Sequence, residues 1–180
     1  MQRNANDHCC TDDTKRSGCL AMNIRQAELD DADAIAEIWN AIIRTSARTF
    51  TTAEKTTEGI AADIRDSKEA FIIAEIDGEI IGFATYFSFR SGPGYAFTKE
   101  HSVNLDQRAW GKGVGRALMD RLELIAKADG VHSLIAGVSG ENPDGVAFHK
   151  AIGFEEVAQI PSVGRKFERW MDLILLQKFL

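Results

Sequence analysis

Three glycines at alternate positions, Gly111, Gly113 and Gly115, stand between an alternating polar and apolar stretch and an amphipathic helix pattern. Glycine lets the backbone come close to a ligand and adopt conformations that other residues avoid. The first amide groups of a helix have no partner within the helix, and together with the helix dipole they favour a negative charge. The spacing therefore predicts a turn that binds a phosphate-bearing ligand, with Lys112 and Arg116 adding positive charge.

The strand before this turn and the helix after it must hold the turn in place. Residues 102–106 alternate between polar and apolar side chains, which is typical of a strand with two unlike faces. Residues 114–128 repeat apolar side chains at the spacing of one helix face, at Val114, Leu118, Leu122 and Ile125. The pattern predicts strand, turn and helix in direct succession.

The rest of the chain alternates between helix and strand patterns. Acidic residues at 30–33 cap the clearest helix, whose inner face carries Ile35, Ile38, Trp39, Ile42 and Ile43. Asp77-Gly78 is a favoured two-residue turn between apolar strands at 70–76 and 79–87. Further elements are expected as strands at 23–28, 131–138, 154–158 and 167–176, and as helices at 53–65 and 146–151. This order predicts an α/β fold, a mixed sheet with helices on both faces.

The chain of 180 residues is long enough for one domain with its own core, which we place at 22–180. Residues 1–21 are polar and patternless, and we expect them to form a disordered leader. This leader holds all three cysteines: Cys9, Cys10 and Cys19. No disulfide framework therefore supports the fold, and a reducing cytoplasm is the expected compartment. The cysteine spacing matches no zinc pattern, and we expect no metal.

Charge and hydropathy exclude two classes of partner. A net charge of −6 argues against general nucleic-acid binding, which depends on a basic surface that neutralises phosphates. No apolar run approaches the roughly 18 to 20 residues that a membrane-spanning helix needs. We therefore expect neither a nucleic-acid nor a membrane partner.

Three kinds of phosphate-binding turn compete for the glycine cluster. A nucleotide-hydrolase loop needs Gly-Lys followed by Ser or Thr, but Lys112 is followed by Gly113. A dinucleotide fold needs G-x-G-x-x-G near the start of a domain, and the spacing here is G-x-G-x-G past position 110. The third kind is a pyrophosphate turn of the form Q/R-x-x-G-x-G/A, which fits Arg108-Ala-Trp-Gly111-Lys-Gly113.

That third turn is the signature of the GNAT N-acetyltransferase superfamily, which the predicted order of elements also resembles. Within it, the chain resembles the phosphinothricin and methionine sulfoximine (sulfone) acetyltransferase branch over residues 23–180. The motifs that carry this resemblance are Glu100-His-Ser-Val, Asn142 with His149, Gly153-Phe154, Val163-Gly-Arg-Lys166-Phe and Arg169-Trp-Met-Asp172. The resemblance implies the GNAT fold, acetyl-CoA as co-substrate and a homodimer.

The resemblance also assigns positions to the cofactor. The diphosphate of acetyl-CoA would lie on the turn that corresponds to Gly111, Lys112, Gly113, Val114, Gly115 and Arg116. The pantetheine arm would run along the backbone of Val103, Asn104 and Leu105. Asn142 corresponds to a residue that contacts the cofactor from the loop after the neighbouring strand.

Acetyl transfer to an amine sets the chemistry that the site must supply. An alkyl ammonium must lose a proton before it attacks a thioester, and the departing thiolate must be stabilised or protonated. The resemblance assigns the base to Glu100, acting directly or through water. His149 occupies the position where many members carry a tyrosine as the acid.

An amino-acid acceptor carries a carboxylate, which a guanidinium can bind with two hydrogen bonds. Arg90 corresponds to the substrate-side arginine of the family, and Phe50 and Tyr95 correspond to aromatic residues of the pocket wall. The substrate-contact segment corresponds to Glu100, His101 and Ser102. In a regular strand His101 would face away from its two neighbours.

The expected function is acetyl-CoA-dependent N-acetylation of a small amino-acid-like acceptor, of the phosphinothricin, methionine sulfoximine or methionine sulfone type, by direct attack in a ternary complex. One alternative keeps the fold and changes the acceptor to another small amine or a protein N-terminus. A second alternative is a module that binds CoA without turnover. It rests on Asn104 and Gly145, where members of the branch usually carry Tyr and Ser.

Overall fold

The computed structural model describes residues 22–180. The predicted leader, with its cysteines, lies outside the described residues. The elements follow one another as β1 (Met22–Gln26), α1 (Ala32–Thr45), α2 (Thr57–Ser67), β2 (Phe71–Ile76), β3 (Glu79–Ser88), β4 (Thr98–Leu105), α3 (Val114–Ala128), β5 (Ser133–Ser139), α4 (Pro143–Ala151), β6 (Glu155–Lys166) and β7 (Arg169–Phe179). This is the predicted order of helices and strands.

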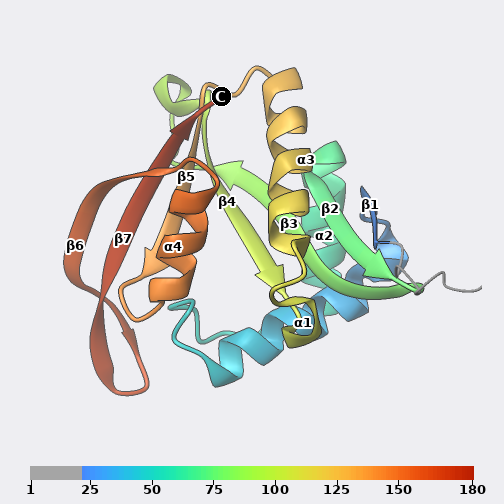
Figure 1. Cartoon of the computed structure of the whole chain (residues 1–180), viewed down its shortest axis with the longest axis horizontal. Helices are drawn as coiled ribbons and strands as arrows, with labels where there is room; N and C mark the ends of the chain where they lie inside the picture. The colour runs from blue at the N-terminus through green and yellow to red at the C-terminus, as the bar shows by residue number, and fades with distance from the viewer. Residues whose placement is uncertain (1–21) are drawn as a thin grey trace, which may run out of the picture.

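The seven strands form one sheet in the order β1-β2-β3-β4-β5-β7-β6 (Figure 1). Every neighbouring pair is antiparallel except β4 and β5, which are parallel. The predicted mixed sheet is therefore confirmed. Its single parallel pair requires a crossover, which α3 provides between β4 and β5.

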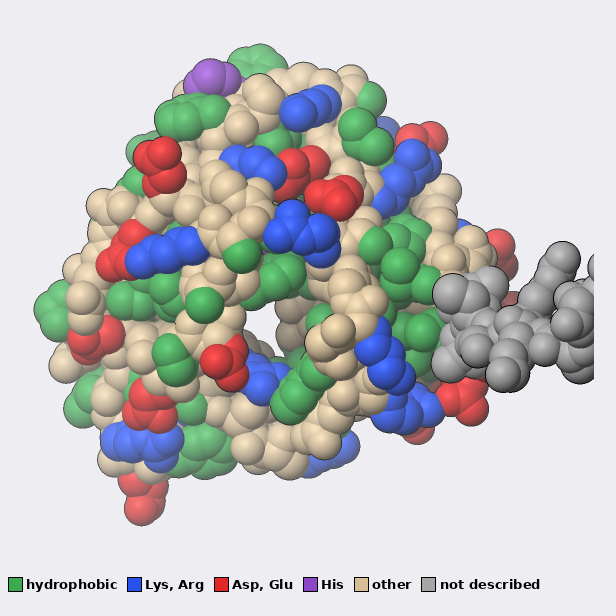
Figure 2. All heavy atoms as spheres, in the orientation of Figure 1, with side chains coloured by type: hydrophobic (Ala, Val, Ile, Leu, Met, Phe, Trp, Pro, Cys, Tyr) green, Lys and Arg blue, Asp and Glu red, His purple; other side chains and the backbone are tan. Residues whose placement is uncertain are grey.

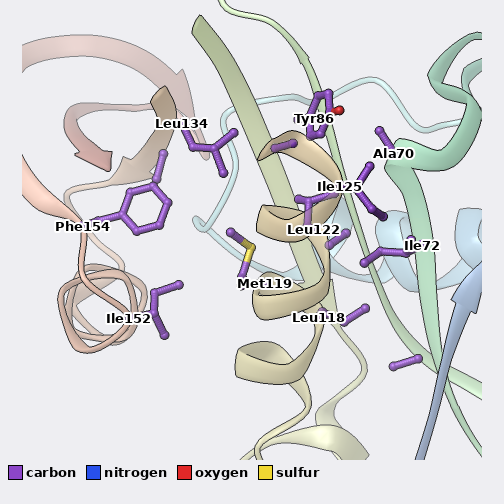
Figure 3. Packing of buried hydrophobic residues seen from close by; sticks show 14 of the residues in the cluster. Ala70, Ile72, Tyr86, Leu118, Met119, Leu122, Ile125, Leu134, Ile152 and Phe154 are labelled. Carbon is purple, nitrogen blue, oxygen red and sulfur yellow. The ribbon is translucent and has the colours of Figure 1, made fainter. Parts of the chain in front are cut away.

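Helices cover both faces of the sheet, as the apolar strands predicted. One buried cluster joins the sheet to α3 and α4, and Figure 3 shows Leu118, Met119 and Leu122 of α3 pointing into it. A second cluster joins the opposite face to α1 and α2, with Ile35 and Ile60 fully buried. The strands are apolar on both sides because each side packs against helices.

The Asp77-Gly78 turn joins β2 and β3 as expected. Both residues have positive φ, 53° at Asp77 and 80° at Gly78. This is the backbone that a two-residue hairpin turn needs and that Asp-Gly favours.

Two helices begin at other residues than predicted. The second helix begins at Thr57 rather than near 53, because the Thr56 side chain caps it by accepting a hydrogen bond from the Gly59 amide at 3.1 Å. The helix predicted from 146 begins at Pro143, since Asn142 is its N-cap and proline suits the first helical position.

The closing hairpin also differs from the prediction. Pro161 and Gly164 were expected in a connection, but β6 runs on to Lys166 and the chain turns at Phe167 and Glu168. The ladder with β7 is irregular between Ile160 and Gly164. Because β6 is an edge strand, a proline at an irregularity there removes no hydrogen bond to a further strand.

Candidate active site

The parallel strands β4 and β5 separate along their length. They pair only from Thr98 with Ser133 to Glu100 with Ile135, although β4 continues to Leu105 and β5 to Ser139. Figure 1 shows the two strands diverging, with α4 beside the gap. From His101 onward β4 is paired with β3 on one side only, so its other edge presents backbone amides and carbonyls to the gap.

A cavity of about 1000 Å³ occupies this gap. Figure 2 shows an opening through the molecule at the place where Figure 1 shows α4 beside β4. The predicted residues that line the cavity are Phe50, Glu100, His101, Ser102, Val103, Asn104, Leu105, Gly111, Gly115, Asn142 and His149. The structure thus brings together residues from both sides of the glycine turn and from the α1–α2 loop.

The glycine turn has the backbone that its sequence predicts. Gly111 and Gly113 have φ of +71° and +78°, and a Cβ on either would meet no atom within 4 Å. The space beside both residues is therefore open. Gly113 is also the N-cap of α3, so the first amides of that helix begin directly after it.

Other residues of the turn lie outside the cavity lining. Gly113 and Val114 are not among the lining residues, and Lys112 borders a separate hollow of about 280 Å³. Arg116 donates a hydrogen bond to the carbonyl of Ala151 at 2.9 Å, which ties the start of α3 to the end of α4. Arg108 forms ion pairs with Asp106 and Glu79.

Asn142 caps α4 at the edge of the cavity. Its Oδ1 accepts a hydrogen bond from the Gly145 amide at 3.0 Å. A Cβ on Gly145 would lie 2.3 Å from Asn142 Nδ2, so a serine there would force the amide to move. Gly145 therefore permits the conformation of Asn142 that faces the gap.

Glu100 lies where β4 and β5 separate. Its side chain is half-buried and lines the cavity, and burial raises the pKa of the carboxyl above its usual 4.5. The positive charge of Arg90 opposes this rise in pKa. A carboxylate whose pKa is raised is a stronger base, which suits the removal of a proton from an ammonium.

His149 is buried in α4 with one ring nitrogen bonded. Nδ1 lies 2.7 Å from the carbonyl oxygen of Gly145, which can only accept a hydrogen bond, so Nδ1 carries the proton. Nε2 then holds a lone pair, and it has no partner among the described residues. Burial lowers the pKa of His149, so the ring is neutral at pH 7.

His101 packs against His149 from the facing side of β4. The two ring centroids are 5.1 Å apart, and Phe154 lies beside both. His101 is 6% exposed and faces the α3 and α4 side with Val103, as strand alternation predicts. Burial lowers the pKa of His101 to about 3, and electrostatic repulsion from a protonated His149 is the second cause.

The acceptor residues expected from the sequence divide into two groups. Phe50 lines the cavity, whereas Arg90 and Tyr95 do not. Tyr95 is 46% exposed and packs against Phe89, with their ring centroids 6.4 Å apart. The guanidinium of Arg90 stacks on the same Phe89 ring at 5.1 Å.

Several lining residues were missed by the sequence analysis. Arg48, Thr49 and Thr51 of the α1–α2 loop line the cavity, as does Trp110 beside the glycine turn. The guanidinium of Arg48 lies 4.3 Å from the Trp110 ring centroid, so the loop contacts the turn across the cavity. A tryptophan directly before the first glycine was the available signal.

Residues 22–180 contain neither a candidate metal cluster nor a membrane-spanning helix. Nowhere in this range do three or more His, Cys, Asp or Glu side chains form a group suited to a metal ion. None of the helices described is long and apolar enough to cross a membrane.

Known proteins resemble this chain over most of its length. Residues 33–154 match the model of the acetyltransferase (GNAT) family. The L-methionine sulfoximine/L-methionine sulfone acetyltransferase of Salmonella typhimurium is 36% identical over 161 residues, which cover 87% of this chain and 93% of that protein. The phosphinothricin N-acetyltransferase of Alcaligenes faecalis is 34% identical over 164 residues, covering 88% and 82% of the two chains.

A solved structure agrees with these relatives. It is that of a Salmonella typhimurium protein with its cofactor acetyl-CoA, which matches with a TM-score of 0.85 and 34% identity over 89% of this chain and 94% of the other. Because the family model spans most of the chain and both relatives exceed 30% identity, the chain belongs to the GNAT acetyltransferase family and is an N-acetyltransferase.

Proposed function

We propose that this enzyme transfers the acetyl group of acetyl-CoA to the amino group of a small amino-acid-like acceptor, of the phosphinothricin, methionine sulfoximine or methionine sulfone type. The observation that carries the proposal is the position of Glu100. Its half-buried carboxyl lies at the point where β4 and β5 separate, in a cavity that also reaches the glycine turn. The similarity to acetyltransferases of these acceptors supports the choice.

The residues at the gap fit acetyl-CoA. The unpaired edge of β4 at Val103, Asn104 and Leu105 offers backbone groups to the amides of a pantetheine arm. The open glycine turn and the first amides of α3 suit its diphosphate, and Asn142 contacts it from α4. Acetyl-CoA supplies an activated thioester. A main-chain contact at Asn104 does not depend on the tyrosine that the resemblance implies for this position.

Glu100 and His149 divide the proton transfers. Glu100 takes one proton from the acceptor ammonium, directly or through water, so that the nitrogen lone pair can attack the thioester carbonyl. The nitrogen must lose a second proton as the amide forms, and the departing thiolate must gain one. The lone pair at Nε2 of His149 accepts the second proton and passes it to the sulfur.

The acceptor lies on the Glu100 side of the cavity. Phe50 forms an apolar wall there, and Ser102 lines the same face of β4 as Glu100. Arg90 acts electrostatically on Glu100, so a carboxylate placed between them would meet its positive charge. Tyr95 and His101 complete the proposed acceptor segment. Tyr95 and Arg90 both pack on Phe89, and His101 follows Glu100 on β4.

The function is tested by measuring free CoA release with acetyl-CoA and a panel of acceptors. The panel contains phosphinothricin, methionine sulfoximine, methionine sulfone, ordinary amino acids, a simple alkylamine and a peptide with a free N-terminus. We expect turnover with the first three acceptors. The rate with the peptide should be about a hundredfold lower, because the peptide loses one charged contact and meets one steric clash. Turnover with the peptide or the alkylamine alone would refute the amino-acid acceptor.

The same preparation distinguishes an enzyme from a binding module. Thermal unfolding is followed with and without acetyl-CoA, because a ligand that binds only the folded state raises the unfolding temperature. Stabilisation by acetyl-CoA without release of CoA for any acceptor would support a module that binds without turnover. Arg90→Ala is expected to raise the KM of the acceptor and leave that of acetyl-CoA unchanged. Arg121→Ala is its control, because Arg121 is an exposed arginine of α3 outside the cavity lining.

We also propose that the enzyme is a cytoplasmic homodimer. The outer strand β6 is a free edge of the sheet, and the closing hairpin exposes large apolar side chains: Val157, Ile160, Val163, Phe167, Trp170 and Phe179. Exposed apolar side chains of this kind favour a second copy of the chain over water. Residues 22–180 contain no cysteine, which suits a reducing compartment.

A further inference from the structure

The loop between α1 and α2, residues 46–56, forms one wall of the cavity. Its lining residues are Arg48, Thr49, Phe50, Thr51 and Lys55. The loop has no helix or strand of its own, so side chains from other elements must fix it. In Figure 1 it leaves α1 and runs beside the lower half of the β6–β7 ribbon.

Lys166, the last residue of β6, holds this loop. Its Nζ donates hydrogen bonds to the carbonyls of Ser46 at 2.9 Å and Thr49 at 3.0 Å. The residue is only 4% exposed, and no carboxylate of residues 22–180 lies within 4.0 Å of its ammonium. Burying a charge is costly unless it is well bonded, and here two loop carbonyls bond it. An ammonium in this position therefore ties the loop firmly to β6.

Gly164, two residues earlier on β6, leaves room for the side chain of Phe50, which is the loop's aromatic residue in the cavity wall. A Cβ on Gly164 would lie 2.3 Å from Cδ2 of Phe50, a distance that real side chains do not reach. The Phe50 ring therefore lies directly on the glycine backbone. Any larger residue at 164 would push the ring off β6.

The other end of the loop is fixed independently. The buried side chain of Asn40 in α1 donates to the carbonyl of Lys55 at 2.9 Å and accepts from its amide at 2.7 Å. The segment between the two anchors contains Phe50. Lys166 and Gly164 thus control the part of the loop that Asn40 does not hold.

We propose that Lys166 and Gly164 are positioning residues that set acceptor specificity, because together they fix Phe50 and the loop 46–51 at the acceptor end of the cavity. The inference rests on the proposed acetylation of a small amino-acid-like acceptor. Lys166 acts through the loop carbonyls and Gly164 through the Phe50 ring; neither lines the cavity itself. The same loop reaches the cofactor turn through Arg48, whose guanidinium lies 4.3 Å from the Trp110 ring centroid. The KM of acetyl-CoA is therefore measured beside that of the acceptor.

The first test is Lys166→Met, which keeps most of the length of the side chain and removes its donors. We expect the KM of the acceptor to rise by about tenfold, the order of effect of losing charged hydrogen bonds that hold a wall in place, with the KM of acetyl-CoA within about twofold of the native value. Lys166→Arg can still donate to both carbonyls, so its acceptor KM should stay close to the native value. Unchanged acceptor KM in Lys166→Met would overturn the proposal.

Lys178→Met is the matched control for general destabilisation. Lys178 is also a largely buried lysine of the closing hairpin, but its Nζ bonds Glu123 and the carbonyl of Ile152, away from the loop. We expect it to lower the unfolding temperature without changing the ratio of the two KM values. If Lys178→Met and Lys166→Met raise both KM values alike, the effect is structural and the proposal is wrong.

Gly164→Ala tests specificity directly. The displaced Phe50 ring should narrow the acceptor end, so kcat/KM should fall more for methionine sulfone than for the shortest amino acid that the native enzyme acetylates. We expect the ratio of kcat/KM for the two acceptors to change by about threefold or more, since one methyl group in a pocket discriminates between substrates on this order. An equal fall for both acceptors would contradict a role in specificity.

Amide hydrogen exchange separates this inference from the function on which it rests. In Lys166→Met the amides of residues 46–51 should exchange faster, while those of β4 keep their native protection. This readout needs no acceptor and no turnover. If the native enzyme acetylates nothing on the panel, the proposed function fails while the exchange of the loop still tests the anchoring by Lys166. Unchanged exchange at 46–51 would refute the anchoring whatever the activity.

Discussion

The carboxylate of Glu100 lies against Gly137 of the neighbouring strand, where a Cβ would come within 3.0 Å of Oε1. The contact crosses the point at which β4 and β5 separate, because the last paired residues are Glu100 and Ile135. A side chain on β5 here would occupy the space of the carboxylate. Gly137 thus permits the position of the proposed base. Beyond this contact, β4 and β5 form no further backbone pairing.

Gly137→Ala should slow the reaction without unfolding the enzyme. The carboxylate must move by a few tenths of an ångström, and a displaced base loses alignment with the ammonium. We expect kcat to fall by about threefold to tenfold, less than the roughly hundredfold that a 1 Å displacement can cause. Steady-state kinetics and thermal unfolding measure the two effects. A native kcat in Gly137→Ala would show that the position of Glu100 does not limit the reaction.

Glu100→Gln should remove the acid limb of the pH profile. Burial raises the pKa of Glu100, so the native enzyme should lose kcat/KM for the acceptor as pH falls through a value above 4.5, because the protonated carboxyl cannot accept a proton. The glutamine variant has no such group, and its rate should be about a hundredfold lower at neutral pH. Its affinity for acetyl-CoA should not change.

Glu141→Gln is the control for that experiment. Glu141 is an exposed carboxylate of the β5–α4 loop that pairs with Arg169 outside the cavity lining. Its replacement should leave both the rate and the pH profile as they are. If Glu100→Gln keeps the native acid limb, the base must be sought elsewhere.

Local patterns were sufficient to predict the fold, and where they failed the cause is a contact between residues distant in sequence. The helix periodicity of α1 and α3 and the Asp-Gly hairpin are properties of short segments, so the sequence alone revealed them. The start of α2 depends on the Thr56 cap and also on the side chain of Asn40. Asn40 bonds the backbone of Lys55 and keeps the residues before the cap out of the helix. That bond links residues distant in sequence, and no pattern announces it.

The same contrast between short-range patterns and long-range contacts applies to the active site. The glycine turn and the cavity face of β4 could be predicted because they are continuous stretches. The wall formed by the α1–α2 loop could not, because Lys166 reaches it from the other end of the chain. The neutral state of His149 likewise depends on its burial and on the carbonyl of Gly145, which become visible only in the folded protein.

Gly113→Ala should weaken acetyl-CoA binding more than its cost in stability explains. Gly113 has φ of +78°, and Gly130, at the other end of α3, has φ of +72°. An alanine at either position costs about 1 kcal/mol of strain, so the two variants should unfold at similar temperatures. Only Gly113→Ala should raise the Kd of acetyl-CoA, by about tenfold, because it distorts the amides proposed for the diphosphate. Calorimetric titration measures this, and equal affinities would reject the assignment.

His101 should make the protein less stable in mild acid. Its folded pKa of about 3 lies below the usual 6.5, so between these values the unfolded chain binds a proton that the folded protein cannot. As pH falls below 6.5, the free energy of unfolding should drop by about 1.4 kcal/mol per pH unit from this residue, and above 6.5 the residue contributes no pH dependence. His101→Leu lacks the titrating ring and removes its two buried nitrogens, which have no partner among the described residues. Urea unfolding at pH 7.5, 6 and 5 should therefore show the variant gaining stability relative to the native protein at each step below 6.5; a constant difference would mean that His101 is protonated in the folded state.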